Sequence, residues 1–178
     1  MTLTEMIRNH ADLIEMFTDP EQFTWLHRDN RIWMGYFYNP ESDRTFVFNA
    51  MNLKQMGMGN AWGLGFIALE GKEHAEDDLS NMFYLQWRGT EEAGKTGAFS
   101  NVSVAVFSTL GHMFNEFVTN VKPPSFMFGV KPNEPESRLK LYKAICSRIQ
   151  KQNYGYTFSE EPDPFYGGKL FMFTRTGK

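Results

Sequence analysis

The residues best suited to specific polar contacts lie in the segment 133–156, which is rich in cations. Its cations are Arg138, Lys140, Lys143, Arg148 and Lys151. The helical period puts Lys140, Lys143 and Lys151 roughly on one outward face, with Tyr154 just beyond it. Arg138, early in the helix, suits a bidentate contact. This face could bind phosphate or an acidic protein surface, or it could be a solvated helix face. Arg138, Lys140, Lys143 and Tyr154 are therefore candidate binding residues.

Residue types that catalyse reactions or hold metals do not stand in the patterns those functions need. The four histidines show no metal-ligand spacing, and Cys146 alone cannot form a thiolate cluster. His74 lies among five acids, but that segment lacks the spacing and central glycine of a calcium loop. Cys146 has no histidine in sequence range, and Ser108 and Thr109 lack a nucleophile-elbow context. We therefore predict no catalytic residue, no metal site and no cofactor.

Composition limits the class of protein and its partners. The chain has 178 residues, of which 42% are hydrophobic, and its formal net charge is −3. Length and composition predict one domain over residues 1–178. The negative charge gives no global attraction to nucleic acid or anionic lipid, although a local basic face remains possible. The single cysteine suits a reducing compartment, and no stretch has the pattern of a membrane span or secretory signal. We therefore expect a soluble intracellular protein without a membrane partner.

The elements that must position these side chains divide the chain into three parts. Residues 1–20 have the capping and apolar spacing of an N-terminal helix. Residues 21–100 form a β-rich half, and residues 101–178 follow a helix–strand–helix–strand–strand order. The predicted strands are Arg31–Tyr38, Arg44–Met51, Ala61–Leu69, Asn81–Arg88, Ser125–Gly129, Tyr154–Phe158 and Lys169–Thr174. This order predicts an α+β fold with a mixed, mostly antiparallel sheet and helices packed on it.

Two long helices are expected to cover that sheet. An apolar stripe at the helical period runs from Val102 to Phe117, and Lys122-Pro-Pro124 ends this helix. A capping pattern at Asn133 begins the second helix. The side chains expected in the buried contact are Leu110, Phe114, Tyr142 and Ile145.

The first predicted strand carries rings on both faces. Alternation puts Tyr36 and Tyr38 on one face, and Trp33 and Phe37 on the other. A half-solvated antiparallel strand normally keeps one face polar. We therefore predict that Trp33 and Phe37 belong to an apolar contact patch for a partner or for self-association. Cover by the N-terminal helix is the alternative.

Several short sequences resemble known families. Ser137-Arg-Leu-Lys-Leu-Tyr142 and Tyr154-Gly-Tyr156 resemble the last helix and following strand of Gcn5-related N-acetyltransferase (GNAT) domains, and the order of elements over residues 31–175 is also GNAT-like. Ala105-Val-Phe-Ser-Thr-Leu110, Lys122-Pro123 and Ser137–Tyr142 also resemble small uncharacterised proteins of tailed bacteriophages. The closing Lys169–Arg175 is similar to the C-terminus of a GNAT-like internal virion protein from short-tailed phages. The second resemblance implies a location in the cytoplasm of the infected bacterial host or in the phage virion.

The GNAT resemblance raises the question of acetyl transfer. That activity needs a loop, (Gln/Arg)-x-x-Gly-x-(Gly/Ala), whose N–H groups hold the coenzyme A phosphates at a helix N-terminus. The corresponding junction, Asn101–Gly111, has no glycine pair, and Gln55–Gly59 is one residue short and is typical of a turn between strands. We therefore predict a phage-type non-catalytic binding protein whose macromolecular partner, expected to be a protein, is a virion component or host factor. The alternatives are an acyl-CoA N-acyltransferase with a degenerate cofactor loop, and a small-molecule or nucleotide binder that uses a gap between splayed strands.

Overall fold

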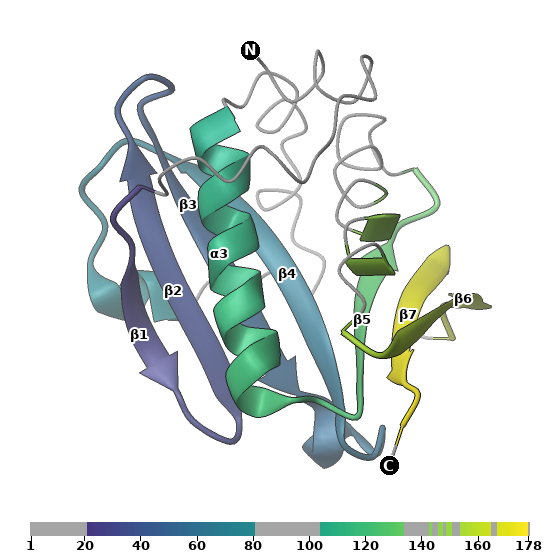
Figure 1. Cartoon of the computed structure of the whole chain (residues 1–178). Coiled ribbons are helices and arrows are strands. Elements are labelled where there is room, and N and C mark those ends of the chain that lie inside the picture. Colours follow the sequence, from purple (N-terminus) through teal and green to yellow (C-terminus); the bar gives the residue numbers. More distant parts are fainter. Residues whose placement is uncertain are drawn as a thin grey trace.

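The protein is built around one large sheet with a long helix across one face (Figure 1). The computed structural model describes residues 21–80, 104–133, 143, 146–147, 149–150, 154–164 and 167–177. Its strands are β1 (Thr24–Arg28), β2 (Ile32–Asn39), β3 (Arg44–Asn52), β4 (Ala61–Glu70), β5 (Ser125–Val130), β6 (Tyr156–Pro162) and β7 (Lys169–Arg175). The long helix is α3 (Val104–Val121), and η1 (Leu53–Met56) is a single 3₁₀ turn.

The seven strands form one mixed sheet in the order β1-β2-β3-β4-β5-β7-β6. β4 and β5 are parallel, and every other neighbouring pair is antiparallel. The prediction of a mixed, mostly antiparallel sheet in an α+β fold is confirmed at this level. Strands from both predicted halves of the chain belong to the same sheet.

Six of the seven predicted strands are present among the described residues. β2, β3 and β4 start within one residue of their predicted positions, and β6 begins two residues late and ends four residues late. β1 was not predicted, and it adds an antiparallel edge strand beside β2. Asn81–Arg88, the N-terminal helix 1–20 and most of the second predicted helix lie outside the described residues.

Helix α3 packs on the sheet through the apolar stripe seen in the sequence. Its buried apolar side chains are Val106, Phe107, Leu110, Met113, Phe114, Phe117 and Val118. The approach is close at Gly35 of β2, where a Cβ atom would lie 2.7 Å from Met113 Cε and 2.9 Å from the carbonyl oxygen of Thr24. Only a residue without a Cβ fits between the helix and the backbone of β1, because real Cβ atoms do not approach other atoms so closely.

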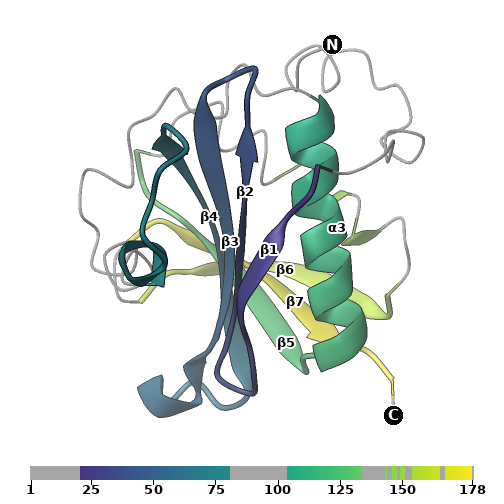
Figure 2. The same ribbon diagram turned by 90° about the vertical axis from the view of Figure 1, so that its left-hand side faces the viewer.

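Both faces of the antiparallel half of the sheet are covered. On the face away from α3, Met34, Val47 and Ile67 form a buried cluster with Leu79, which belongs to the helical residues 76–80. Figure 2 shows α3 and this short helical segment on opposite sides of the sheet. A strand that is covered on both faces needs no polar face, which explains why β2 carries apolar side chains on both sides.

This cover corrects the prediction of a contact patch at Trp33 and Phe37. Trp33 is 8% exposed and Phe37 is 1% exposed, and both belong to the main core beneath α3. Trp33 meets Phe117 at a centroid distance of 5.9 Å, and Phe37 stacks on Phe46 at 5.5 Å. These rings therefore stabilise the fold and do not form an exposed surface.

The double variant Trp33→Ser, Phe37→Ser should fail to fold. Replacing a single buried aromatic ring by a small side chain costs about 3–5 kcal/mol, and two such losses approach the total stability of a typical domain. Circular dichroism against temperature should show no cooperative transition, or one that is strongly lowered. A double variant that melts near the wild-type temperature would return the two rings to a surface role.

Phe114→Ala should destabilise the protein by about 3–5 kcal/mol, the usual cost of truncating a buried aromatic ring. Leu110 and Phe114 are buried as predicted, whereas Tyr142 and Ile145 lie outside the described residues. Phe114 packs edge-on against Phe126 at 5.5 Å. Urea unfolding measures the loss, and the exposed Thr119 on the same helix provides the matched control, Thr119→Ala. Equal midpoints for the two variants would show that the helix register is wrong.

Candidate binding site

The first place to look for a ligand is the gap where β4 and β5 separate. The two strands pair from Ala61 with Ser125 to Leu64 with Phe128, and beyond that point they diverge (Figure 1). Phe66 of β4 stacks on Phe128 of β5, with centroids 5.9 Å apart. The gap is therefore closed by rings and not by backbone hydrogen bonds.

Only a small cavity is left in this gap. It has a volume of about 20 Å³, and its lining residues are Phe66, Phe107, Leu110, Gly111, Phe114, Ile149 and Tyr154. A cavity of that size holds about one water molecule, and apolar cavities of this kind stay dry. The pantetheine arm of coenzyme A does not fit here unless the rings move apart.

The predicted basic face is only partly described. Lys143 is exposed on a helical stretch, and Arg138 and Lys140 lie outside the described residues. The ring of Tyr154 packs edge-on against Phe114 at 6.4 Å, and its hydroxyl donates a hydrogen bond to Asn115 Oδ1. Tyr154 thus joins the segment before β6 to α3, so a structural role accounts for it.

Other reactive side chains have structural surroundings. Cys146 is buried, and desolvation together with the charge of Glu160 raises the pKa of its thiol to about 12. Thr109 donates its hydroxyl to the carbonyl of Ala105 at 2.7 Å and accepts the N–H of Glu21 at 2.9 Å. Within the described ranges no group of three or more His, Cys, Asp and Glu side chains is placed to hold a metal ion.

A much larger space lies at the other end of the sheet, where α3 ends (lower end of Figure 1). It is an open hollow of about 580 Å³, within the size range of ligand sites. Its lining residues are Arg28, Asp29, Asn30, Trp33, Asn52, Asn60, Trp62, Asn120, Val121, Lys122, Pro123 and Pro124. We call this space the asparagine hollow.

The walls of the asparagine hollow are fixed by turn chemistry. Asp29 Oδ1 accepts the backbone N–H groups of Arg31 at 2.7 Å and Ile32 at 2.8 Å, which shapes the β1–β2 turn. These hydrogen bonds hold the pKa of Asp29 below its ordinary value, so the carboxylate is ionised at neutral pH. Asn52 accepts the N–H of Lys54 at 3.0 Å and donates to the carbonyl of Asn30 at 3.3 Å.

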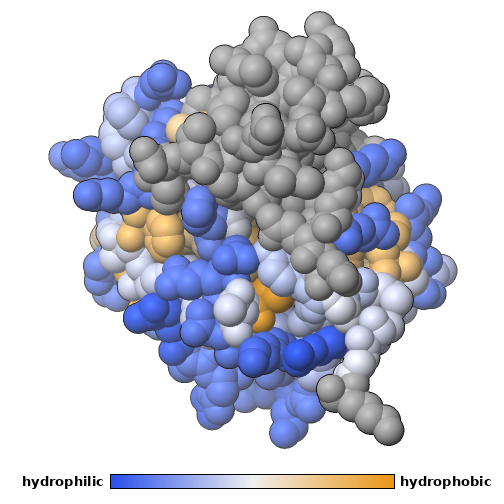
Figure 3. All heavy atoms as spheres, in the orientation of Figure 1, coloured by the Kyte–Doolittle hydropathy of each residue, from blue (hydrophilic) through white to orange (hydrophobic). Residues whose placement is uncertain are grey.

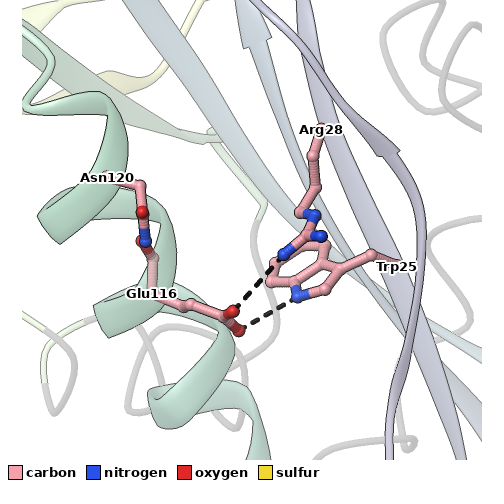
Figure 4. A network of polar contacts seen from close by, with 4 residues as sticks. All are labelled: Trp25, Arg28, Glu116 and Asn120. Carbon is pink, nitrogen blue, oxygen red and sulfur yellow. Dashed lines mark hydrogen bonds and ion pairs between the residues drawn. The ribbon is translucent and has the colours of Figure 1, made fainter.

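One carboxylate of α3 holds the β1 side of the asparagine hollow in place (Figure 4). Glu116 accepts the indole N–H of Trp25 at 3.0 Å and forms an ion pair with Arg28 at 3.6 Å. The guanidinium of Arg28 lies 6.0 Å from the centre of the Trp33 ring. The side-chain NH₂ of Asn120 donates a hydrogen bond to the backbone carbonyl of Glu116 at 2.7 Å. The amide oxygen of Asn120 can therefore accept a hydrogen bond from another group.

Several hydrogen-bond donors of the hollow have no acceptor among the described residues. In the part of the chain that the structure describes, the side-chain amides of Asn30 and Asn60 bond to no residue, and both residues are exposed. No described residue accepts the indole N–H of Trp33 or Trp62, and neither nitrogen is among the buried atoms without a partner. These two N–H groups therefore keep contact with solvent at the floor of the hollow.

Sequence reasoning missed this site. Asn30, Asn52 and Asn60 stand at turns or strand ends, where asparagine is common for conformational reasons alone. The only available signal was the number of asparagines at successive element ends, and Figure 3 shows that most of the described surface around this end is hydrophilic in any case.

The comparisons add no relative. The chain matches no protein-family model, and no curated protein or solved structure is significantly similar to it. No helix among the described residues has the length and apolar character needed to cross a membrane.

The turn between β1 and β2 should lose stability in acid. A carboxyl group with a lowered pKa stabilises the fold above its ordinary pKa of 3.8, and this contribution is lost as the pH falls through the lowered value. Asp29→Ala should therefore destabilise the protein by about 0.5–2 kcal/mol at neutral pH, as for a lost cap, and by less in strong acid. Urea unfolding at several pH values measures the difference, and Asp29→Asn, which keeps an acceptor oxygen, is the control. A pH-independent loss would contradict the assignment.

Proposed function

We propose that this chain is a non-catalytic binding protein that acts on a macromolecular partner, most simply another protein. One contrast supports the proposal. The gap between β4 and β5, where a GNAT-like fold would take its cofactor, is filled by phenylalanine rings around a cavity of about 20 Å³. The asparagine hollow, in contrast, is open, polar and about 580 Å³ in volume. The available space therefore suits a partner that docks from outside better than a cofactor that is enclosed.

A GNAT-like arrangement of the sheet is part of this proposal. Its support is the strand order, the single parallel pair β4–β5 and the divergence of that pair after four paired residues. The same features favour the second candidate, an acyl-CoA N-acyltransferase. Against it stands the chain between β4 and α3: the two elements are separated by residues 71–103, and the short look-alike ending at Gly59 is a glycine turn, with Gly57 at φ 76° and Gly59 at φ 63°.

The proposed partner is a virion component or a host factor. The proposed location is the cytoplasm of an infected bacterial cell or the virion. This part of the proposal depends on the resemblance of Ala105–Leu110 and Lys169–Arg175 to phage proteins. Cross-linking of the tagged full chain in its native cell should give a discrete protein–protein adduct. Cross-links confined to nucleic acid would contradict a protein partner.

Acetyl-CoA should bind no more tightly than about 1 mM, which corresponds to ~4 kcal/mol of binding free energy. The physical reason is the filled gap between β4 and β5, since binding would have to separate Phe66 from Phe128. Isothermal calorimetry with the full chain measures the affinity, and an assay for acetylated products accompanies it. Phe66→Ala, which enlarges the cavity, is the informative companion variant. A micromolar complex with the unaltered protein would restore the acyltransferase.

A further inference from the structure

We propose that the asparagine hollow binds an extended, acidic segment of a partner protein through its main-chain carbonyls and a carboxylate. The inference deepens the proposed function and depends on it, because it names the site and the chemistry of the partner. It is carried by three properties of the hollow: the kind of hydrogen-bonding groups it offers, its charge, and the orientation of its aromatic rings.

The hollow offers both donors and acceptors of hydrogen bonds. The amides of Asn30 and Asn60 have no partner in the described structure, and each can donate and accept at once, as a peptide group does. The indole N–H groups of Trp33 and Trp62 are pure donors at the floor. An extended polypeptide can satisfy this set, because its carbonyls accept from the amides and the indole N–H groups and its N–H groups donate to the amide oxygens.

One cation of the hollow is placed to meet an acidic segment. The lining carries Arg28, Lys122 and Asp29, and Glu116 lies beside it as the ion-pair partner of Arg28. Asp29 is turned to the backbone of its own turn by two hydrogen bonds, and Arg28 is held by Glu116. No ion pair is found for Lys122 among the described residues, and it is exposed, so it is the charge best placed to meet an incoming carboxylate.

The aromatic rings of the hollow distinguish a peptide from other polymers. Single-stranded nucleic acids are held largely by bases stacked on exposed ring faces. Trp33 is 8% exposed and Trp62 is 3% exposed, and both form T-shaped contacts with Phe117. They offer an edge with an N–H group and no stacking platform.

Selection of displayed peptides tests the proposal directly. Short random peptides are selected on the immobilised full chain, and the selected sequences are synthesised and titrated by calorimetry at low salt. We expect the selected sequences to be enriched in Asp and Glu. We also expect Lys122→Glu to weaken their binding by about tenfold or more, which is ~1.4 kcal/mol. Added salt should weaken the complex, because the contact is exposed.

The control variants separate a local effect from a general one. Lys72→Glu makes the same charge change at the opposite end of the sheet, where Lys72 lies exposed over the Tyr38 ring, and it should leave binding unchanged. Lys122→Gln removes the charge without reversing it, and circular dichroism shows that each variant is folded. Asn60→Ala should also weaken binding, because it removes the amide without changing the charge.

Three results would overturn the proposal. Selected peptides without acidic enrichment would contradict the carboxylate, and equal effects of Lys72→Glu and Lys122→Glu would place the contact elsewhere. Oligothymidine that binds in a Lys122-dependent way, when acidic peptides do not, would replace the peptide by a phosphate chain. If no acidic peptide binds and acetyl-CoA does not bind either, the peptide site is wrong but the proposed function stands. If acetyl-CoA binds at micromolar concentration, the proposed function itself is wrong.

Discussion

The packing of Phe117 against three rings of the sheet is the contact on which the rest of the arrangement depends. Phe117 is fully buried and meets Trp33 at 5.9 Å, Phe48 at 6.0 Å and Trp62 at 5.2 Å between centroids. Edge-on and tilted contacts of this kind add to the free energy of burying the rings themselves. Because the three partners lie on β2, β3 and β4, one side chain fixes where α3 crosses the antiparallel half of the sheet. Gly35 then allows the helix to approach closely.

That crossing gives the two ends of the sheet opposite characters. Toward the start of α3, Phe107 and Leu110 fill the space that opens between β4 and β5, and a cavity of about 20 Å³ is left. Toward its end the helix runs into Lys122, which takes a left-handed φ of 48°, and Pro123 and Pro124 lead the chain away into β5. The departing chain leaves the polar turns of the sheet uncovered. A filled end and an open end thus follow from one helix position, and this is why the open end is the better candidate for binding.

Elements whose own residue pattern reflects burial could be predicted from the sequence. Positions that are buried by distant residues could not. The stripe along α3 predicted buried positions that the structure confirms at Leu110 and Phe114, and the runs of β2, β3 and β4 predicted strands that it also confirms. β1 was missed because a five-residue edge strand with a register shift carries little period-2 signal. Trp33 and Phe37 were misread because α3 covers their face and Leu79 covers the opposite one, and neither cover can be seen from β2 alone. The asparagines of the hollow were missed because asparagine is a common turn residue, and only the fold brings them together.

The role of Glu116 links the fold to the site. Its ion pair with Arg28 is exposed, with about half of the Arg28 side chain accessible (53%), so it contributes little to stability, about 0–1 kcal/mol. The same carboxylate also accepts the indole N–H of Trp25, which orients it. Held from two sides, Glu116 keeps the Arg28 guanidinium 6.0 Å from the Trp33 ring at the edge of the hollow. An interaction that adds little stability but restricts a cation to one position lowers the entropy lost when a partner binds. In the proposed site, the network at Glu116 therefore serves to preorganise the binding surface more than to stabilise the fold.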